Sequence, residues 1–236
     1  MAHTILVCDD DKDTASGIRK NLTREGYDVV CVGDGDSAVL AVKSGGIDLV
    51  IMDRMMPDSD GDMDNDAGIY AAREIRRFSD VPILFLSAMG GAADRTLGLQ
   101  AGGDDYVSKP FDNFELLERV RAILRRSRPQ QSSKTNVYQS GALLLDDNKK
   151  IVMVAGEEKK LTLTEYQILL YLMSNMGSAF SPGQIYEAVW NEVYDYSSKK
   201  TVPVHIRHIR EKIEVDTKNP MYLINKSGLG YSVVKL

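Results

Sequence analysis

The stretch IDLVIMDRMMPD, residues 47–58, is an apolar run that ends in an aspartate, Asp53, and passes into a loop that contains Pro57. Comparable apolar runs occur before and after it: TILVC at 4–8, YDVVCV at 27–32, VPILFL at 81–86 and DYVS at 105–108. Amphipathic stretches, such as residues 13–26 and 114–127, accompany these runs. Strands that alternate with helices predict an α/β domain with a doubly wound, five-stranded parallel sheet.

Polar side chains stand at the ends of the predicted strands. Asp9 and Asp10 follow the first run, Asp53 the third, Ser87 the fourth and Lys109 the fifth. In the flavodoxin-like strand order 2-1-3-4-5 the first and third strands are neighbours, and ligands bind beyond the carboxyl ends of the strands. The three aspartates are therefore expected to converge in one cleft.

These residue types indicate phosphoryl chemistry. Clustered carboxylates require a cation, and hard oxygen ligands that leave room for water and a phosphoryl group suit Mg²⁺. Asp53 would act as an in-line nucleophile that forms an acyl phosphate, while Lys109 and Ser87 would contact phosphoryl oxygens. Each residue alone also has an ordinary interpretation, as a helix cap, a turn residue or a solvated lysine. Their joint occurrence at successive strand ends favours a site.

Two other classes of protein fit the sequence less well. A dinucleotide-binding fold needs G-x-G-x-x-G after the first strand, whereas this chain has CDDD at 8–11. An aspartate-nucleophile phosphatase needs an acid/base carboxylate two residues after the nucleophile, and Met55 stands there. Both classes are therefore disfavoured as explanations of this site.

Charge divides the chain into two domains. Residues 1–127 carry 15 Lys+Arg against 23 Asp+Glu, and residues 128–236 carry 14 against 11. The sign changes at RPQQSSKTN, residues 128–136, whose composition is typical of a linker. We therefore predict domains at 1–127 and 137–236, joined by a linker at 128–136. Cys8 and Cys31 lie in apolar runs and are expected to be buried thiols, and no stretch has the length of a membrane span, which predicts a cytoplasmic protein.

The second half has the pattern of a winged helix, an α+β domain. Residues 161–177 predict a helix with Thr164 as N-cap and Gly177 as stop, residues 181–190 a second helix, and residues 201–215 a third. A glycine-containing hairpin at 221–236 follows. The third helix carries an apolar stripe (Val202, Ile206, Ile209, Ile213) opposite a face with Val204, Arg207, His208 and Glu211. That face suits the DNA major groove; the alternative, for Arg207, Arg210 and Lys212, is an ordinary solvated helix surface.

Several motifs resemble known families. ILVCDDD, DLVIMDRMMPD, ILFLSA and AGGDDYVSKPF resemble the receiver domain of bacterial response regulators, and LTLTEYQILLYL, AVW, TVPVHIRHIREKI and GLGY resemble the DNA-binding domain of OmpR/PhoB-type regulators. The resemblance implies phosphorylation of Asp53 by a histidine kinase and Mg²⁺ held by Asp9, Asp10, Asp53 and the Met55 backbone carbonyl. It also implies a Ser87–Tyr106 switch pair beside Lys109 and a cis peptide bond before Pro110. A receiver would assist its own phosphorylation and dephosphorylation, so the resemblance implies that the chain is not a stand-alone enzyme.

The resemblance further implies how the two domains work together. A phosphorylated homodimer would form through the fourth helix, fifth strand and fifth helix of the receiver. It would bind tandem half-sites on double-stranded DNA, with RNA polymerase as a candidate further partner. The charges there suggest pairs across the two-fold axis, although each could also be an unconnected surface charge: Arg95 with Glu115, Asp105 with Arg119 and Asp104 with Arg126.

The predicted DNA contacts include residues outside the third helix as well. His208 stands where the family often carries arginine, and Ser227 where a wing arginine is common, so base preference does not carry over. The full set of predicted DNA contacts is Lys199, Lys200, Val204, Arg207, His208, Arg210 and Lys226.

An acidic insertion departs from the receiver pattern. The family's loop runs Pro-x-x-x-Gly, but here ten residues separate Pro57 from Gly68, with aspartates at alternate positions from Asp58 to Asp66. No register gives the glycine and glutamate that an EF-hand loop needs at its sixth and twelfth positions. We expect a mobile acidic rim that attracts cations diffusely. The alternative function is a phosphorylation-independent regulator that responds to a metal or a protein partner through residues 58–66.

Overall fold

The computed structural model describes residues 2–57, 63–88, 92–127, 136–191, 194 and 198–236, without the side chains of 92–95 and 126–127. Two compact units divide the chain, Met1–Arg125 and Arg126–Leu236. The division falls inside the last helix of the first unit, close to the predicted boundary at residue 127.

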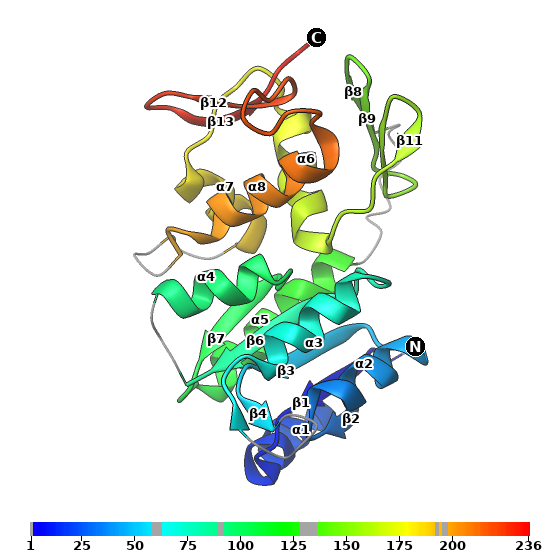
Figure 1. Ribbon diagram of the computed structural model, residues 1–236, viewed down its shortest axis with the longest axis vertical. Coiled ribbons are helices and arrows are strands. Elements are labelled where there is room, and N and C mark those ends of the chain that lie inside the picture. Colours follow the sequence, from blue (N-terminus) through cyan, green and yellow to red (C-terminus); the bar gives the residue numbers. More distant parts are fainter. Residues whose placement is uncertain (1, 58–62, 89–91, 128–135, 192–193, 195–197) are drawn as a thin grey trace. The chain divides into compact units, whose positions relative to one another are not determined.

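The first unit is a parallel sheet of five strands with helices between them (Figure 1). Its strand order is β2-β1-β3-β6-β7, which is the predicted order 2-1-3-4-5. The strands are β1 (Thr4–Cys8), β2 (Asp28–Val32), β3 (Leu49–Asp53), β6 (Ile83–Ser87) and β7 (Asp105–Ser108). The helices are α1 (Lys12–Arg24), α2 (Gly35–Lys43), α3 (Ala67–Arg76), α4 (Ala92–Gln100) and α5 (Asn113–Ser127).

The central strands are continuous apolar runs because both faces of the sheet are covered. Every residue of β3 and β6 is buried, as expected of a parallel sheet between two helical layers. Cys8 is buried with them, whereas Cys31 is partly exposed. Register places Val7 of β1 opposite Ile51 of β3, so the two strands end side by side.

The second unit combines short strands with three helices. Strands β8 (Val137–Ser140), β9 (Leu143–Asp146), β10 (Ile151–Val154) and β11 (Glu157–Glu158) form an antiparallel sheet in the order β11-β10-β9-β8. Helices α6 (Leu163–Ser174), α7 (Pro182–Trp190) and α8 (Thr201–Ile213) precede the hairpin of β12 (Leu223–Lys226) and β13 (Gly230–Val233). This is the predicted winged helix.

Helix starts follow the capping chemistry of the sequence, with one correction. Ser181 caps α7 with Pro182 in its first turn, and α8 begins at Thr201, which leaves Pro203 in the first turn. The N-cap of α6 is Thr162, and the prediction of Thr164 was wrong. Thr162 forms a capping box with Glu165, whereas Thr164 lies inside the helix and is buried.

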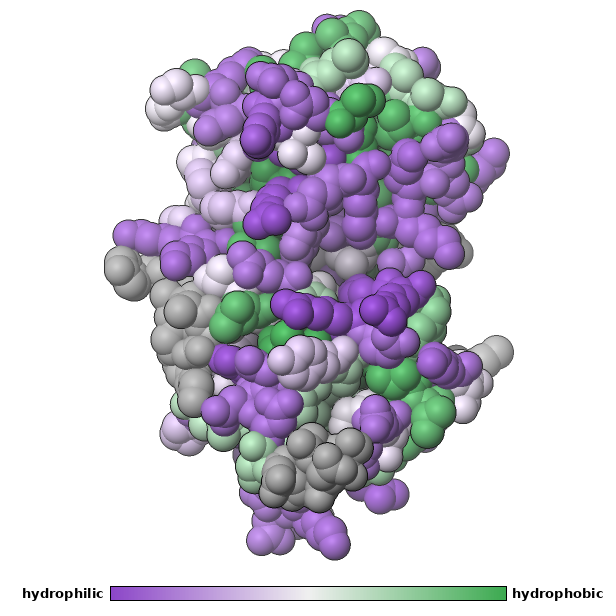
Figure 2. All heavy atoms as spheres, viewed as in Figure 1, coloured by the Kyte–Doolittle hydropathy of each residue, from purple (hydrophilic) through white to green (hydrophobic). Residues whose placement is uncertain are grey.

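The apolar stripe of α8 packs into the core of the second unit, as predicted. Val202, Ile206, Ile209 and Ile213 are all buried in one cluster with Trp190. On the face drawn in Figure 2, polar side chains predominate in both units and apolar side chains form only small separate groups.

Within the described part of the chain, no helix combines the length and the apolar character that crossing a membrane requires.

Candidate functional site

Three aspartates meet at the carboxyl ends of neighbouring strands in the first unit. Asp53 is the last residue of β3, and Asp9 and Asp10 follow β1. One carboxylate oxygen from each lies within 4.8 Å of the others. Asp9 and Asp53 are buried, and Asp10 is partly exposed. The structure thus brings together the three carboxylates that the sequence predicted.

Lys109 joins two of these carboxylates. Its Nζ lies 2.7 Å from Asp9 Oδ2 and 2.7 Å from Asp53 Oδ2. Burial raises the pKa of Asp9, although hydrogen bonding to Lys109 opposes this shift. Burial lowers the pKa of Lys109, but its hydrogen bonds to Asp53 and Asp9 outweigh burial, and the net effect is a raised pKa. The Lys109–Pro110 peptide bond is cis, as the resemblance implied.

The pocket has the donor set that a hard divalent cation needs. Besides its bond to Lys109, Asp53 accepts the Met55 N–H on Oδ1 at 3.2 Å, and Asp9 accepts the Asp11 N–H at 3.0 Å. These bonds orient the carboxylates and leave oxygen lone pairs in the cluster. Oxygen ligands of this kind fit Mg²⁺, which keeps several waters and is bound through one or two carboxylates.

The predicted hydroxyl and aromatic residues also lie in this unit. Ser87 is the last residue of β6 and is buried. Its carbonyl accepts the Lys109 N–H at 2.7 Å, which places the serine and the lysine at adjacent strand ends. Tyr106 of β7 packs into the core cluster of the first unit.

Gly68 is a site residue that the sequence prediction missed. It lies in the first turn of α3, and its N–H donates to the Arg54 carbonyl at 3.0 Å. A Cβ at this position would lie 2.0 Å from the Asp53 carbonyl oxygen. Only glycine therefore lets α3 approach the backbone of the proposed nucleophile. Its place at the end of the Pro-to-Gly loop was the available sequence signal.

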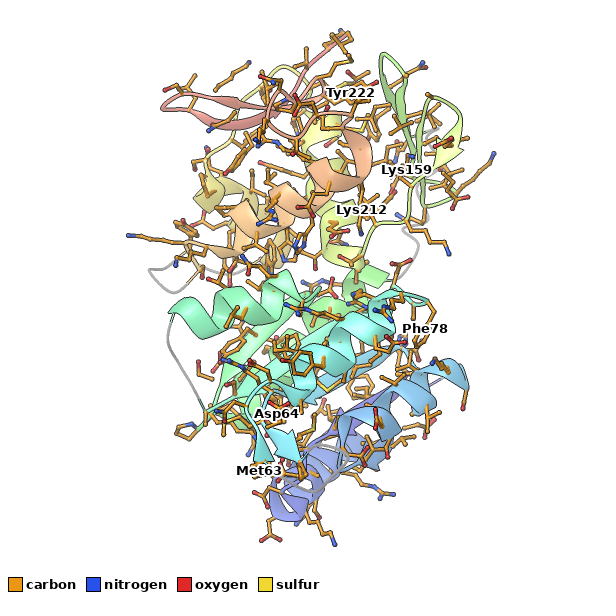
Figure 3. The ribbon with its side chains drawn as sticks, in the orientation of Figure 1. Met63, Asp64, Phe78, Lys159, Lys212 and Tyr222 are labelled. Atoms are coloured by element: carbon orange, nitrogen blue, oxygen red, sulfur yellow. The ribbon has the colours of Figure 1, made fainter. Side chains whose placement is uncertain are left out.

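The insertion is anchored at both of its ends. Strand β4 (Met56–Pro57) pairs with β5 (Met63–Asp64) in an antiparallel ladder, and Figure 3 labels the two residues of β5. Arg54 binds Asp66 through Nη2 at 2.6 Å and Nε at 3.1 Å. Residues 58–62, which carry the rest of the predicted mobile rim, lie outside the described residues. For residues 63–66 the prediction of a mobile rim was wrong, because a strand pairing and an ion pair hold them.

Three residues of the predicted dimer surface contact one another within the chain. Arg119 of α5 bonds Asp105 at 3.0 Å and Glu115 at 3.1 Å. The pair that we expected across a two-fold axis, Asp105 with Arg119, is therefore formed inside one protomer. The side chains of Arg95 and Arg126 lie outside the described part of the structure.

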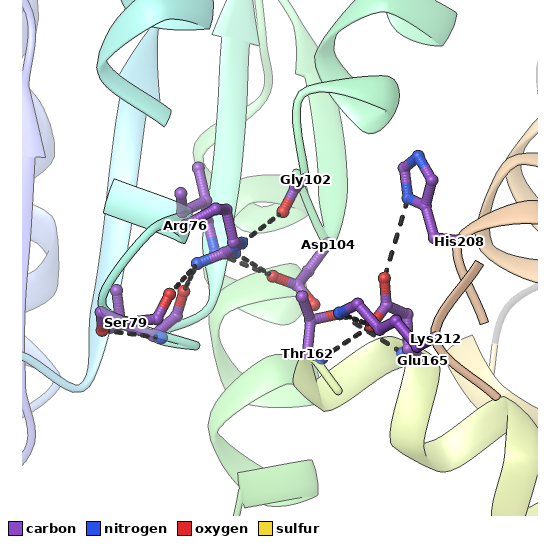
Figure 4. Close-up of polar contacts among 10 residues, drawn as sticks. Arg76, Ser79, Gly102, Asp104, Thr162, Glu165, His208 and Lys212 are labelled. Carbon is purple, nitrogen blue, oxygen red and sulfur yellow. Dashed lines mark hydrogen bonds and ion pairs between the residues drawn. The ribbon is translucent and has the colours of Figure 1, made fainter. Parts of the chain in front are cut away.

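Asp104 belongs to the interior of the first unit. Its side chain is fully buried and accepts Nη2 of Arg76 at 2.9 Å and the Ile83 N–H at 3.0 Å. Figure 4 shows Arg76 bonded also to the Gly102 carbonyl and to the loop that contains Ser79. The prediction that Asp104 pairs with Arg126 of a second protomer is corrected, because a fully buried carboxylate is not on the surface.

The predicted DNA-binding face of α8 is only partly exposed. Lys199 and Lys200, just before the helix, are exposed, and Arg207 exposes 69% of its side chain while pairing with Glu211. His208 Nδ1 lies 3.7 Å from Oε1 of Glu165 in α6. The second carboxylate oxygen, Glu165 Oε2, accepts a hydrogen bond from Lys212 Nζ of α8 at 2.6 Å (Figure 4). Burial lowers the pKa of His208, although Glu165 opposes this effect.

Three of the residues predicted to contact DNA are buried or have partners within the protein. Val204 is buried, which removes its apolar side chain from water. Arg210 Nε donates to the Leu223 carbonyl at 2.9 Å, and its guanidinium lies over the Tyr231 ring. Lys226 donates to the Gly177 carbonyl at 2.7 Å. Arg210 therefore braces the hairpin against α8, a role that the sequence prediction did not include, and its contact with DNA stays a prediction.

Both units match families of known proteins. Residues 5–121 match the response regulator receiver domain, and residues 156–233 match the transcriptional regulatory protein, C-terminal family. A solved structure of a RitR variant covers 100% of both chains with a TM-score of 0.76 at 23% identity, which supports the fold alone. DrrB of Thermotoga maritima, an OmpR/PhoB homologue, is 27% identical with a TM-score of 0.51 and covers 99% of this chain and 100% of its own.

Curated relatives match along the whole chain. The uncharacterized transcriptional regulatory protein YrkP of Bacillus subtilis is 42% identical over 98% of both chains. The sensory transduction protein RegX3 of Mycolicibacterium smegmatis is 34% identical, also over 98% of both. The chain therefore belongs to the OmpR/PhoB family of two-component response regulators, with a receiver domain followed by a winged-helix DNA-binding domain.

Proposed function

We propose that this regulator is switched by transfer of a phosphoryl group from a histidine kinase to Asp53. The observation that carries the proposal is the position of Lys109, whose ammonium group lies between Asp53 and Asp9 at 2.7 Å from each. A cation held at that point is placed to contact the phosphoryl group that an attacking Asp53 would receive.

The residues of the pocket divide the work of the transfer. An Asp53 carboxylate oxygen attacks phosphorus in line, the P–N bond of the phosphohistidine breaks, and its electron pair leaves with the imidazole. Lys109 and the Ser87 hydroxyl bind the phosphoryl oxygens. Asp9, Asp10, Asp53 and the Met55 carbonyl would hold Mg²⁺, which would neutralise charge on the phosphoryl oxygens. The product is an acyl phosphate on Asp53.

The phosphorylated receiver then controls DNA binding. The proposed sequence is dimerisation through α4, β7 and α5, followed by binding of two winged helices to tandem half-sites and a change in transcription. Arg207, His208 and the lysines before α8 are the proposed DNA contacts. His208→Ala should change base preference, whereas Lys200→Ala should weaken binding to all sequences alike. Because its partners are a kinase and DNA, we place its action in the cytoplasm.

A phosphodonor assay tests the central step. The full chain is incubated with a small phosphodonor and Mg²⁺, and the phosphorylated form is separated on a phosphate-retarding gel. Wild type should shift and Asp53→Ala should not, while Asp80→Ala, at the opposite end of the sheet before β6, should shift like wild type. Equal phosphate uptake by wild type and Asp53→Ala would contradict the assignment of the nucleophile.

A second candidate function uses the insertion instead of the phosphoryl group. It is favoured by the ordered contact between Asp66 and Arg54, the residue next to Asp53. In that case the insertion would transmit binding of a metal or a protein partner to the receiver. The gel separates the two, because a phosphorylation-independent regulator would show no shift in wild type.

A further inference from the structure

Met55 lies between two residues that are anchored to the insertion. In receivers of this family the backbone carbonyl at this position is a ligand of Mg²⁺, so its placement affects the ion. The neighbour on one side is Arg54, and the neighbour on the other side is Met56. Both make contacts with residues 63–66, which belong to the ten-residue stretch between Pro57 and Gly68.

Arg54 is held by its side chain and by its backbone. Both guanidinium contacts go to Asp66 Oδ1, at 2.6 and 3.1 Å. The Arg54 side chain is 7% exposed and that of Asp66 is 40% exposed, so the pair extends from the interior to the surface. The Arg54 N–H donates to the Leu86 carbonyl at 3.0 Å, and its carbonyl accepts from Gly68 at 3.0 Å.

Met56 is held by strand pairing and by packing. It is opposite Asp64 in the β4–β5 ladder, and Pro57 is opposite Met63. Its side chain is fully buried, with Sδ 3.3 Å from Cys8 Sγ beneath the carboxylate pocket. The peptide of Met55 is thus fixed on both sides, and its own N–H binds Asp53.

We propose that the insertion positions the Met55 carbonyl for Mg²⁺, with Arg54 and Asp66 as positioning residues. The inference rests on the proposed function, because it assumes that the pocket binds the ion. Residues that orient metal ligands through hydrogen bonds typically change metal affinity 10–100-fold when they are mutated. The insertion then acts through local geometry and not as a diffuse attractor of cations.

Positioning and electrostatic attraction predict opposite effects of Arg54→Gln on the affinity for Mg²⁺. Arg54→Gln removes a positive charge beside a carboxylate pocket, so a purely electrostatic account predicts tighter Mg²⁺ binding. Positioning predicts weaker binding, because the anchor of the loop is lost. Asp66→Asn and Asp64→Asn remove the same charge from the same insertion. Asp64 is the matched control, because its Oδ1 accepts a neutral N–H, that of Asp66 at 2.8 Å, and asparagine keeps this bond. At residue 66 asparagine loses the negative charge that pairs with the Arg54 guanidinium.

Magnesium titrations of the full chain, followed by backbone amide shifts in NMR spectra, measure the dissociation constant directly. Asp53→Ala gives the background of binding elsewhere. Arg54→Gln and Asp66→Asn should raise the dissociation constant roughly 10-fold, Asp64→Asn should change it less than 2-fold, and Asp66→Glu should restore part of the affinity. Thermal unfolding of each variant verifies that it is folded.

Three results would overturn the inference while leaving the proposed function intact. They are tighter or unchanged binding by Arg54→Gln, equal losses in Asp66→Asn and Asp64→Asn, and unchanged binding by Asp66→Asn. If Arg54→Gln does not fold, the comparison of the two asparagine variants decides. A wild type that neither binds Mg²⁺ at this pocket nor takes up phosphate would contradict the proposed function, and the inference with it.

Discussion

Replacing Asp104 with alanine should destabilise the receiver unit by about 3–5 kcal/mol, the usual cost of removing one partner of a buried ion pair. Arg76 would keep its carbonyl acceptors, Gly102 at 2.9 Å and Val81 at 2.6 Å, but would lose its carboxylate. The Ile83 N–H, now 3.0 Å from Asp104, would lose its acceptor as well. The estimate follows from the complete burial of Asp104.

Urea unfolding measures this loss and separates the two units. At a slope of about 2 kcal/mol per molar urea, the expected loss moves the receiver midpoint down by roughly 1.5–2.5 M in far-UV circular dichroism. Trp190, the single tryptophan, lies in the winged-helix core and reports on that unit through its fluorescence. Its transition should move little if the units unfold independently.

Two further variants make the test specific. Glu115→Ala removes the half-exposed partner of Arg119 and should cost only about 0–1 kcal/mol. The double variant Arg76→Met with Asp104→Leu replaces both charges by apolar groups and should be less destabilised than Asp104→Ala alone. If Asp104→Ala unfolds like Glu115→Ala but weakens self-association of the phosphorylated protein, the buried-pair assignment is wrong and the original dimer assignment is right.

Three other predictions concern contacts in the two units. Gly68→Ala should cost about 1–3 kcal/mol of stability and slow phosphorylation, because its Cβ would lie 2.0 Å from the Asp53 carbonyl oxygen; unchanged urea midpoint and phosphorylation rate would contradict this. Arg210→Ala should destabilise the winged-helix unit by about 1–3 kcal/mol, whereas Arg207→Ala should leave stability within about 0.5 kcal/mol and reduce DNA affinity; equal stabilities of the two variants would show that the brace is unimportant. Burial raises the pKa of Asp147, but hydrogen bonds from Lys150 and Tyr166 outweigh burial, and the pKa lies below its ordinary value. The Asp147 carboxylate therefore stabilises the winged-helix unit when the pH is above that ordinary value. This contribution to stability is lost as the pH falls from about 5. The Trp190 unfolding midpoint should fall over that range, and less so in Asp147→Asn; parallel curves would refute the role of Asp147.

The carboxylate pocket could be predicted because parallel strands fix where their ends meet. Asp9, Asp53 and Lys109 are distant in sequence, but each follows an apolar run, and the strand order brings those ends together. No side-chain detail was needed for that prediction. The same reasoning located the apolar stripe of α8, because helical periodicity alone specifies which residues share a face.

Contacts across the chain were harder to predict, because periodicity gives a direction but not a partner. Arg210 was assigned to DNA from its place on the helix, whereas the Leu223 carbonyl that it binds belongs to the later hairpin. Asp104 looked like one of two adjacent surface charges until its partner, Arg76 of α3, was known. The cap of α6 was different. Its Thr162-x-x-Glu165 spacing was present in the sequence and should have been preferred over Thr164.

Glu165 gives the winged-helix unit a form of cooperativity. One carboxylate oxygen, Oε2, accepts both the Thr162 N–H at 2.8 Å, which closes the start of α6, and Lys212 at 2.6 Å, which secures α8. Fraying of the first turn of α6 therefore also releases a contact to α8, and undocking of α8 loosens the cap of α6. Local opening of either helix therefore also breaks a hydrogen bond of the other helix, which raises the free energy of opening. The amide hydrogens of α6 and α8 should consequently exchange through a shared opening event.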